Sequence, residues 1–192
     1  APGEGVKLTA AAVETSFGKQ ALRAEAAGAA PAWTTAPVAA KVAAPHRPTK
    51  VFLLSAYLRA GGPGVKVRLS LADRNEESAW RAPIEAANKA ALEKDPKAAV
   101  KTPVETVSEP GTATLGTTWQ RVAARLEVDA RRPEQSLAGS LEVLEGAPAV
   151  LLADGLQLEQ ACVYPLSEND PTSWIPGGEK RGPAWIDLAA RE

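Results

Sequence analysis

The run from Val65 to Leu71 alternates strictly between apolar and polar side chains, and it constrains the fold more than any other feature. Its four odd-numbered positions are valine or leucine, and the three between them are lysine, arginine and serine. Successive side chains of a β-strand point to opposite faces of a sheet. The pattern therefore predicts a strand with one face in a core and the other in water. Similar alternation marks further segments, namely Val6–Ala10, Gln20–Ala26, Val51–Ala60, Trp119–Val128 and Ala149–Glu159.

Turn-forming residues separate these short runs. The chain of 192 residues contains 16 prolines and 15 glycines, and Gly61–Gly64 reads as a turn between two predicted strands. Short alternating segments between such turns are typical of all-β domains. The chain is therefore expected to form a single all-β domain, and its length suffices to bury a real core.

One segment departs from the strand pattern. Apolar residues recur at helical spacing from Pro83 to about Asp95, with charged residues between them. This predicts one helix over about 83–95, inserted between two strands, with Pro83 in its first turn and Pro96 ending it. The charged face of this helix is expected to be solvated. The following stretch, Lys101–Gly116, is rich in proline, threonine and glutamate and is expected to be a long loop.

Charge and residue counts exclude several classes of function. The chain has 22 Lys and Arg against 23 Asp and Glu, so it offers no concentrated cationic surface for a nucleic acid. A single cysteine and a single histidine exclude zinc sites built from those residues, and an internal disulfide. No apolar run reaches the roughly 18 residues of a membrane span.

Catalytic motifs are also missing from the sequence. The one histidine, His46, lies between prolines in a loop-like setting, and no nucleophile elbow accompanies it. Gly61–Gly64 is not followed by the lysine and hydroxyl residue of a phosphate-binding loop. We therefore expect no enzymatic activity from this domain.

Five short segments, in order along the chain, resemble motifs of jelly-roll carbohydrate-binding modules, the group that includes families four, nine and twenty-two. They are Ser16–Arg23, Phe52–Ala60, Thr117–Val122, Leu151–Glu159 and Pro171–Pro176. The resemblance implies a jelly-roll β-sandwich of two antiparallel sheets with one inserted helix. It also implies a domain over residues 1–176, with an insertion at about 74–116, and an exit segment over 177–192 that leads to a following domain. The opening strand of the family is absent, and the insertion is longer than the family's usual loop.

The resemblance also implies a structural calcium site near Asp154, since related modules often hold calcium in this region. Calcium needs six to eight oxygen ligands. The alternative is that Asp154 caps a turn or pairs with an arginine. No other cofactor is expected.

A polysaccharide or oligosaccharide is the ligand that the resemblance implies, bound on a sheet face outside the core. Aromatic rings stack on the apolar face of a pyranose, and polar side chains bind its hydroxyls. The candidates are the aromatic residues Trp33, Tyr57, Trp80 and Trp119 and the polar residues Arg59, Arg121, Gln157 and Glu159. By strand parity, all of these except Trp33 and Trp80 can share one face. Trp80 lies in the insertion, where it is either an exposed platform or the anchor that docks the insertion.

Two functions remain open from the sequence. The first is a non-catalytic accessory module of a larger exported, polysaccharide-degrading protein, such as a glycoside hydrolase or lyase, located outside the cell or at its surface. The second is a spacer domain that packs against neighbouring domains of the same polypeptide or against other proteins and binds no glycan. The near-neutral charge and the abundance of alanine suit the second function as well.

Overall fold

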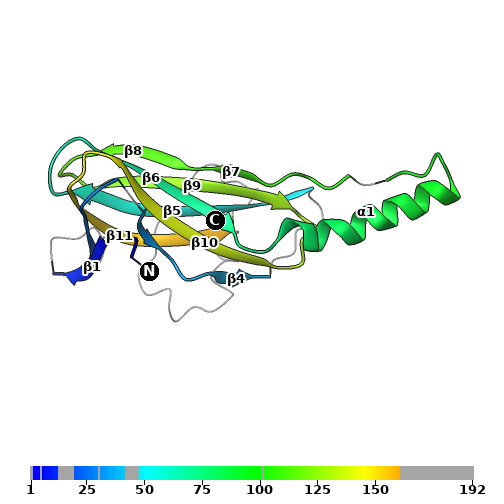
Figure 1. Ribbon diagram of the computed structural model, residues 1–192, viewed down its shortest axis with the longest axis horizontal. Coiled ribbons are helices and arrows are strands. Elements are labelled where there is room, and N and C mark those ends of the chain that lie inside the picture. Colours follow the sequence, from blue (N-terminus) through cyan, green and yellow to red (C-terminus); the bar gives the residue numbers. More distant parts are fainter. Residues whose placement is uncertain are drawn as a thin grey trace, which may run out of the picture.

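Two antiparallel sheets lie face to face in the computed structural model, which describes residues 2–4, 6–12, 20–29, 31–41, 48–100 and 102–160 (Figure 1). The first sheet contains, in spatial order, β1 (Val6–Ala11), β2 (Ala21–Ala26), β11 (Ala149–Gln160), β5 (Thr49–Ala60), β9 (Gln120–Asp129) and β7 (Val107–Glu109). The second contains β3 (Pro31–Thr34), β10 (Gln135–Glu145), β6 (Val65–Asp73) and β8 (Gly111–Leu115), with β4 (Val38–Ala40) also pairing with β10. Consecutive strands repeatedly cross between the sheets, as in a jelly roll. The predicted all-β sandwich is confirmed.

The core lies between the two sheets and is lined by the apolar residues of the alternating strands. The four apolar residues of Val65–Leu71 are at most 5% exposed, and those of β5 face them from the other sheet. Gly139 of β10 lies directly against this layer, because a Cβ added there would overlap the Leu54 side chain. Close packing of the two inner faces therefore fixes which side of each strand points outward.

The inserted helix is confirmed, but its predicted start is wrong. The helix α1 spans Glu77–Lys94, so Pro83 lies in its interior and not in its first turn. The segment before Pro83 favours a helix, because it holds good helix formers, and Arg81 forms an ion pair with Glu77 one turn away. The missing N–H of Pro83 removes one helical hydrogen bond, to the carbonyl of Ala79, which is exposed and can bond to water.

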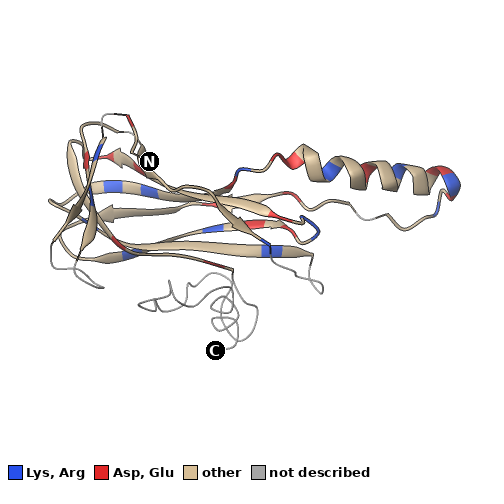
Figure 2. Ribbon diagram, turned by 90° about the horizontal axis from the view of Figure 1, so that it is seen from below, with Lys and Arg blue, Asp and Glu red and all other residues tan. Residues whose placement is uncertain are grey.

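The helix projects from one end of the sandwich, and the chain then runs back to β7 (Figure 1). None of the 18 residues of α1 is buried. Acidic and basic side chains are interleaved along it (Figure 2), as expected for a solvated surface.

Part of the segment expected to be a loop is paired into the sheets. β7 pairs with β9 at the edge of the first sheet, and β8 pairs with β6 at the edge of the second. Both strands are short, and Pro110 separates them. β7 has only three residues, too few to show an alternation, whereas β8 alternates over its five residues, with Thr112 and Thr114 exposed and Leu115 buried.

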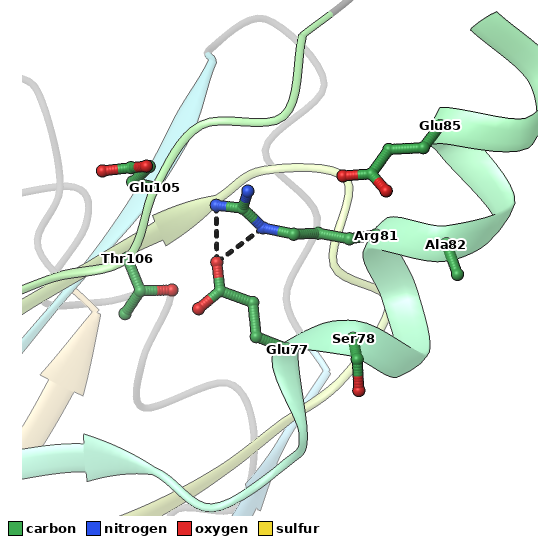
Figure 3. Close-up of a pocket in the computed structure, with 7 residues that line it drawn as sticks. All are labelled: Glu77, Ser78, Arg81, Ala82, Glu85, Glu105 and Thr106. Atoms are coloured by element: carbon green, nitrogen blue, oxygen red, sulfur yellow. Dashed lines mark hydrogen bonds and ion pairs between the residues drawn. The ribbon is translucent and has the colours of Figure 1, made fainter. Parts of the chain in front are cut away.

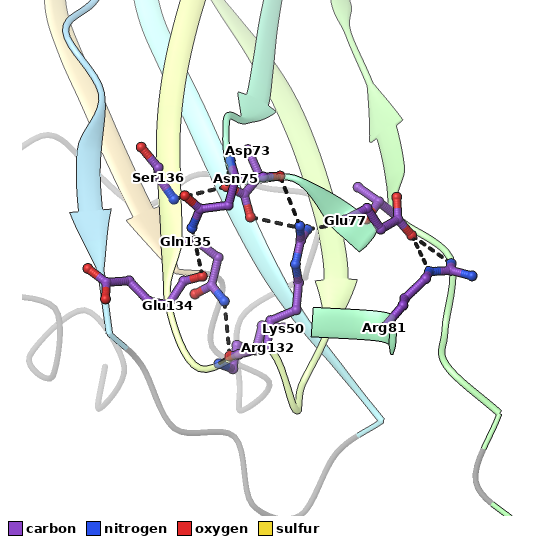
Figure 4. Close-up of polar contacts among 10 residues, drawn as sticks. Lys50, Asp73, Asn75, Glu77, Arg81, Arg132, Glu134, Gln135 and Ser136 are labelled. Carbon is purple, nitrogen blue, oxygen red and sulfur yellow. Dashed lines mark hydrogen bonds and ion pairs between the residues drawn. The ribbon is translucent and has the colours of Figure 1, made fainter. Parts of the chain in front are cut away.

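A buried polar cluster fixes the end of the sandwich where α1 leaves it (Figure 4). Arg132, in the turn between β9 and β10, forms an ion pair of 3.1 Å with Asp73 at the end of β6, and both side chains are at most 3% exposed. Oδ1 of Asp73 accepts hydrogen bonds from the backbone N–H groups of Ser136 and Asn75. The carbonyl of Arg132 accepts a 2.6 Å hydrogen bond from Nζ of Lys50. These bonds tie β5, β6 and β10 to the first turn of the insertion.

Some expectations fall outside the described residues. They are His46, the motif Pro171–Pro176, the first half of Ser16–Arg23 (residues 16–19) and the exit segment 177–192. In the part of the chain that the structure describes, no helix is long and apolar enough to cross a membrane.

Candidate functional site

Six of the candidate residues gather on the outer face of the first sheet. Tyr57 of β5 lies opposite Arg121 of β9 on one side and opposite Asp154 of β11 on the other. Gln157 of β11 lies opposite Ser55 of β5. We call this surface the polar strip, which consists of Ser55, Tyr57, Arg59, Trp119, Arg121, Gln157 and Glu159. The expectation from strand parity that these six candidate residues share one outer face of a sheet therefore agrees with the structure.

Hydrogen bonds run across the strip from β9 to β11. Nη2 of Arg121 donates to Oγ of Ser55 at 3.1 Å and to Oε1 of Gln157 at 3.2 Å. Nε2 of Gln157 then donates to Oε2 of Glu159 at 3.0 Å. Each polar group thereby holds the orientation of the next, so the array is organised before any ligand arrives.

Two aromatic rings accompany this array, each with a guanidinium group against it. Arg121 lies 5.5 Å from the ring centre of Tyr57, and Arg59 lies 4.9 Å from that of Trp119, which immediately precedes β9. Both distances are within the range of cation–π attraction, which stabilises the positions of the rings. The aromatic residues are half-buried, whereas Gln157 and Glu159 are 3% and 4% exposed.

A β-bulge in β11 places the acceptor side chains of Gln157 and Glu159 on the polar strip. The register shifts between Asp154 and Gln157, and Gly155 between them has a φ of +55°. Oδ1 of Asp154 accepts a 2.8 Å hydrogen bond from the N–H of Gly155, which stabilises this local conformation. The bulge reverses the parity of the strand, so Asp154 and Gln157 both face outward.

The structure shows a local role for Asp154 at the bulge. Within the described ranges, no group of three or more His, Cys, Asp or Glu residues could hold a metal ion. The carboxylate of Asp154 accepts the hydrogen bond from Gly155 at the bulge. The calcium site stays a prediction. A melting temperature that rises when calcium is added, and that no longer rises in Asp154→Asn, would support it.

The other two aromatic candidates lie elsewhere. Trp33 of β3 belongs to the second sheet and is 3% exposed within the core, so it does not join the strip. Trp80 lies on α1 and packs against Arg132 at 5.2 Å. Arg132 follows the end of β9, where Asp129 pairs with Thr49 at the start of β5. Tyr57 lies eight residues further along β5, about 26 Å from Thr49, so Trp80 is far from the polar strip.

Sequence reasoning missed one member of the strip. Ser55 was placed on the non-core side of its strand but not among the candidates, although it is 0% exposed and receives a hydrogen bond from Arg121. Its parity with Tyr57 and Arg59 is the signal that could have identified it.

The chain resembles solved carbohydrate-binding modules. No family model and no curated protein matches it. The CBM22-1 xylan-binding domain of Paenibacillus barcinonensis Xyn10C is 18% identical, with a TM-score of 0.44 and 82% of each chain covered. TmCBM61, solved with β-1,4-galactotriose, is 13% identical with a TM-score of 0.43, covering 83% of this chain and 86% of that one. A family 16 carbohydrate-binding module is 14% identical with a TM-score of 0.42, covering 81% and 86%.

Proposed function

We propose that this domain is a non-catalytic module that binds a polysaccharide or oligosaccharide on the polar strip. The single observation that supports this best is that three adjacent strands combine two aromatic rings with one connected array of donors and acceptors. A sugar presents both an apolar face and hydroxyl groups, and this combination matches both. Tyr57 and Trp119 would stack on pyranose rings, and Arg59 and Arg121 would donate to hydroxyls. Gln157 and Glu159, which are buried, would hold Arg121 in its orientation and would not contact the sugar themselves.

The biological setting follows from the same proposal. A module of this kind would belong to a larger exported, polysaccharide-degrading protein, outside the cell or at its surface. By holding its neighbouring catalytic domain close to the substrate, it would raise the effective concentration of the enzyme without doing chemistry itself.

Affinity electrophoresis through gels that contain a polysaccharide tests the proposal. The ligands named for similar structures make xylan and β-1,4-galactan the first choices, followed by mannan and mixed-linkage glucan. Tyr57→Ala removes a stacking platform and is expected to weaken binding about tenfold, which is about 1.4 kcal/mol. Tyr57→Phe keeps the ring and should retain most of the affinity. Val38→Ala, an exposed change on the other sheet, should behave as the unchanged protein does.

A packing domain that binds no glycan is the second candidate. The observation in its favour is α1, none of whose residues is buried within this chain. Unretarded migration in every polysaccharide gel, together with co-migration of an adjoining domain added in trans, would establish this function in place of sugar binding.

A further inference from the structure

A hollow of about 710 Å³ opens where α1 leaves the sandwich. Its walls come from the first turns of α1 and from the turn between β9 and β10, and we call it the helix-root hollow. Its lining includes Asn75, Glu76, Trp80, Pro83, Ile84 and Pro133. Its volume falls within the range of small-molecule sites, which is about 300–1,000 Å³.

The walls of the hollow are held in place before any ligand binds. Arg132 and Arg81 lie 5.2 and 5.7 Å from the ring centre of Trp80. Arg132 is itself fixed by its buried ion pair with Asp73. Nδ2 of Asn75 donates a 3.1 Å hydrogen bond to the carbonyl of Glu134, which links the entry of α1 to the opposite wall. A preformed site loses little conformational entropy when a ligand enters.

The charged groups around the hollow are nearly all neutralised within the chain. Arg132 pairs with Asp73, Arg131 with Asp129, and Glu134 with Lys41 at 3.3 Å. Glu76 is exposed at the start of α1, where its side chain makes no capping hydrogen bond. The hollow therefore offers no excess of positive charge to attract an anion.

The chemistry of the walls selects the ligand. Trp80, Pro83, Ile84 and Pro133 provide an apolar surface, while Glu76 is a strong hydrogen-bond acceptor at its edge. A ligand that fits both is neutral, has an apolar face and carries hydroxyl donors. We propose that the helix-root hollow is a second carbohydrate subsite, which binds one pyranose unit with its apolar face toward Pro133 and Ile84 and a hydroxyl toward Glu76. This inference rests on the proposed sugar-binding function.

A second hollow, on another side of the same helix, provides a contrast (Figure 3). It measures about 560 Å³ and contains Glu77, Glu85 and Glu105 around Arg81, which is paired with Glu77. Its lining lacks aromatic and proline residues, so we assign it no sugar. It does supply a matched control, because Ala79 lines the helix-root hollow and Ala82 lines this one, and both are exposed.

The test uses the indole N–H resonances of the full chain in a ¹H–¹⁵N spectrum. Trp80 reports on the hollow, Trp119 on the polar strip, and the core residue Trp33 serves as an internal reference. Each resonance is assigned by its loss in a Trp→Phe variant. The probes are xylotetraose, cellotetraose, mannotetraose and β-1,4-galactotetraose, titrated separately. We expect the Trp80 and Trp119 resonances to shift with separate dissociation constants.

Two variants then locate the binding. Ala79→Phe fills the hollow and should raise the dissociation constant reported by Trp80 about tenfold or more, while the constant reported by Trp119 stays unchanged. Ala82→Phe adds the same ring on another side of the helix and should change neither constant. The helical circular dichroism of both variants is compared with that of the unchanged protein.

The outcomes separate this inference from the proposed function. Shifts at Trp119 alone would overturn the second subsite and leave the strip as the binding site. Shifts at Trp80 alone, abolished by Ala79→Phe, would support the subsite and overturn the strip. No shift at either residue would overturn both proposals, and a Trp80 response that survives Ala79→Phe would overturn the subsite.

Discussion

At the scale of single residues, Asp129 links burial to the pH dependence of stability. Its carboxylate is 0% exposed and accepts hydrogen bonds from Nε and the backbone N–H of Arg131 and from the backbone N–H of Val104. Burial raises the pKa of Asp129, but the bonds from Arg131 and Val104 outweigh burial and lower it from 3.8 to about 2. A carboxyl group whose pKa is depressed by folding stabilises the protein above its unfolded pKa, and this contribution is lost as the pH falls through the folded pKa.

We therefore predict that the free energy of unfolding falls by about 2 kcal/mol as the pH drops from about 5 to about 2, through this group alone. Urea unfolding measured across that range checks this in the unchanged protein and in Asp129→Asn, whose curve should be lower above pH 5 and flatter below it. Glu93→Gln, on the exposed surface of α1, is the control and should keep the original slope. Parallel curves for the protein and Asp129→Asn would contradict the assignment.

At the scale of elements, α1 is a helix that the sandwich anchors at one end only. Pro83 in its interior costs about 3 kcal/mol relative to alanine at such a position. We predict that Pro83→Ala strengthens the helix, because the N–H of residue 83 could then bond to the carbonyl of Ala79. Amide hydrogen exchange should slow across residues 84–94 while the midpoint of global unfolding hardly moves. Ala90→Gly should have the opposite effect on exchange. Unchanged protection in Pro83→Ala would show that packing at the helix root, and not the proline, limits its stability.

At the scale of the whole molecule, the sandwich holds all of the main core. The buried cluster consists of residues from the strands, and no residue of α1 belongs to it. We predict that replacing residues 82–100 by a Gly-Ser-Gly linker changes the free energy of unfolding by less than about 1 kcal/mol, since it removes no buried apolar side chain. Denaturant unfolding checks this, and the variant keeps both Trp80 and the contact between Val104 and Asp129. A loss of several kcal/mol would mean that the helix stabilises the sandwich through contacts beyond its root.

The sequence by itself determined the elements whose pattern is local. Alternation in Val65–Leu71 and Val51–Ala60 identified strands and their core faces, and it grouped Tyr57, Arg121 and Gln157 on one surface. Helical spacing identified α1, although Pro83 suggested a start six residues too late. These predictions succeeded because a side chain's direction within a strand or helix depends only on its own segment.

Only the tertiary structure decided what depends on distant partners. β10 lies at the centre of the second sheet yet was not predicted, and Gly139 interrupts the apolar positions along it. The same holds for the inward position of Trp33, for the bulge after Asp154, and for the buried pair of Asp73 and Arg132, which are 59 residues apart in sequence. The packing of two sheets over one core decides which strands become neighbours and which charged side chains pair inside. That packing depends on residues far apart in the chain, so the pattern of a single segment does not predict it.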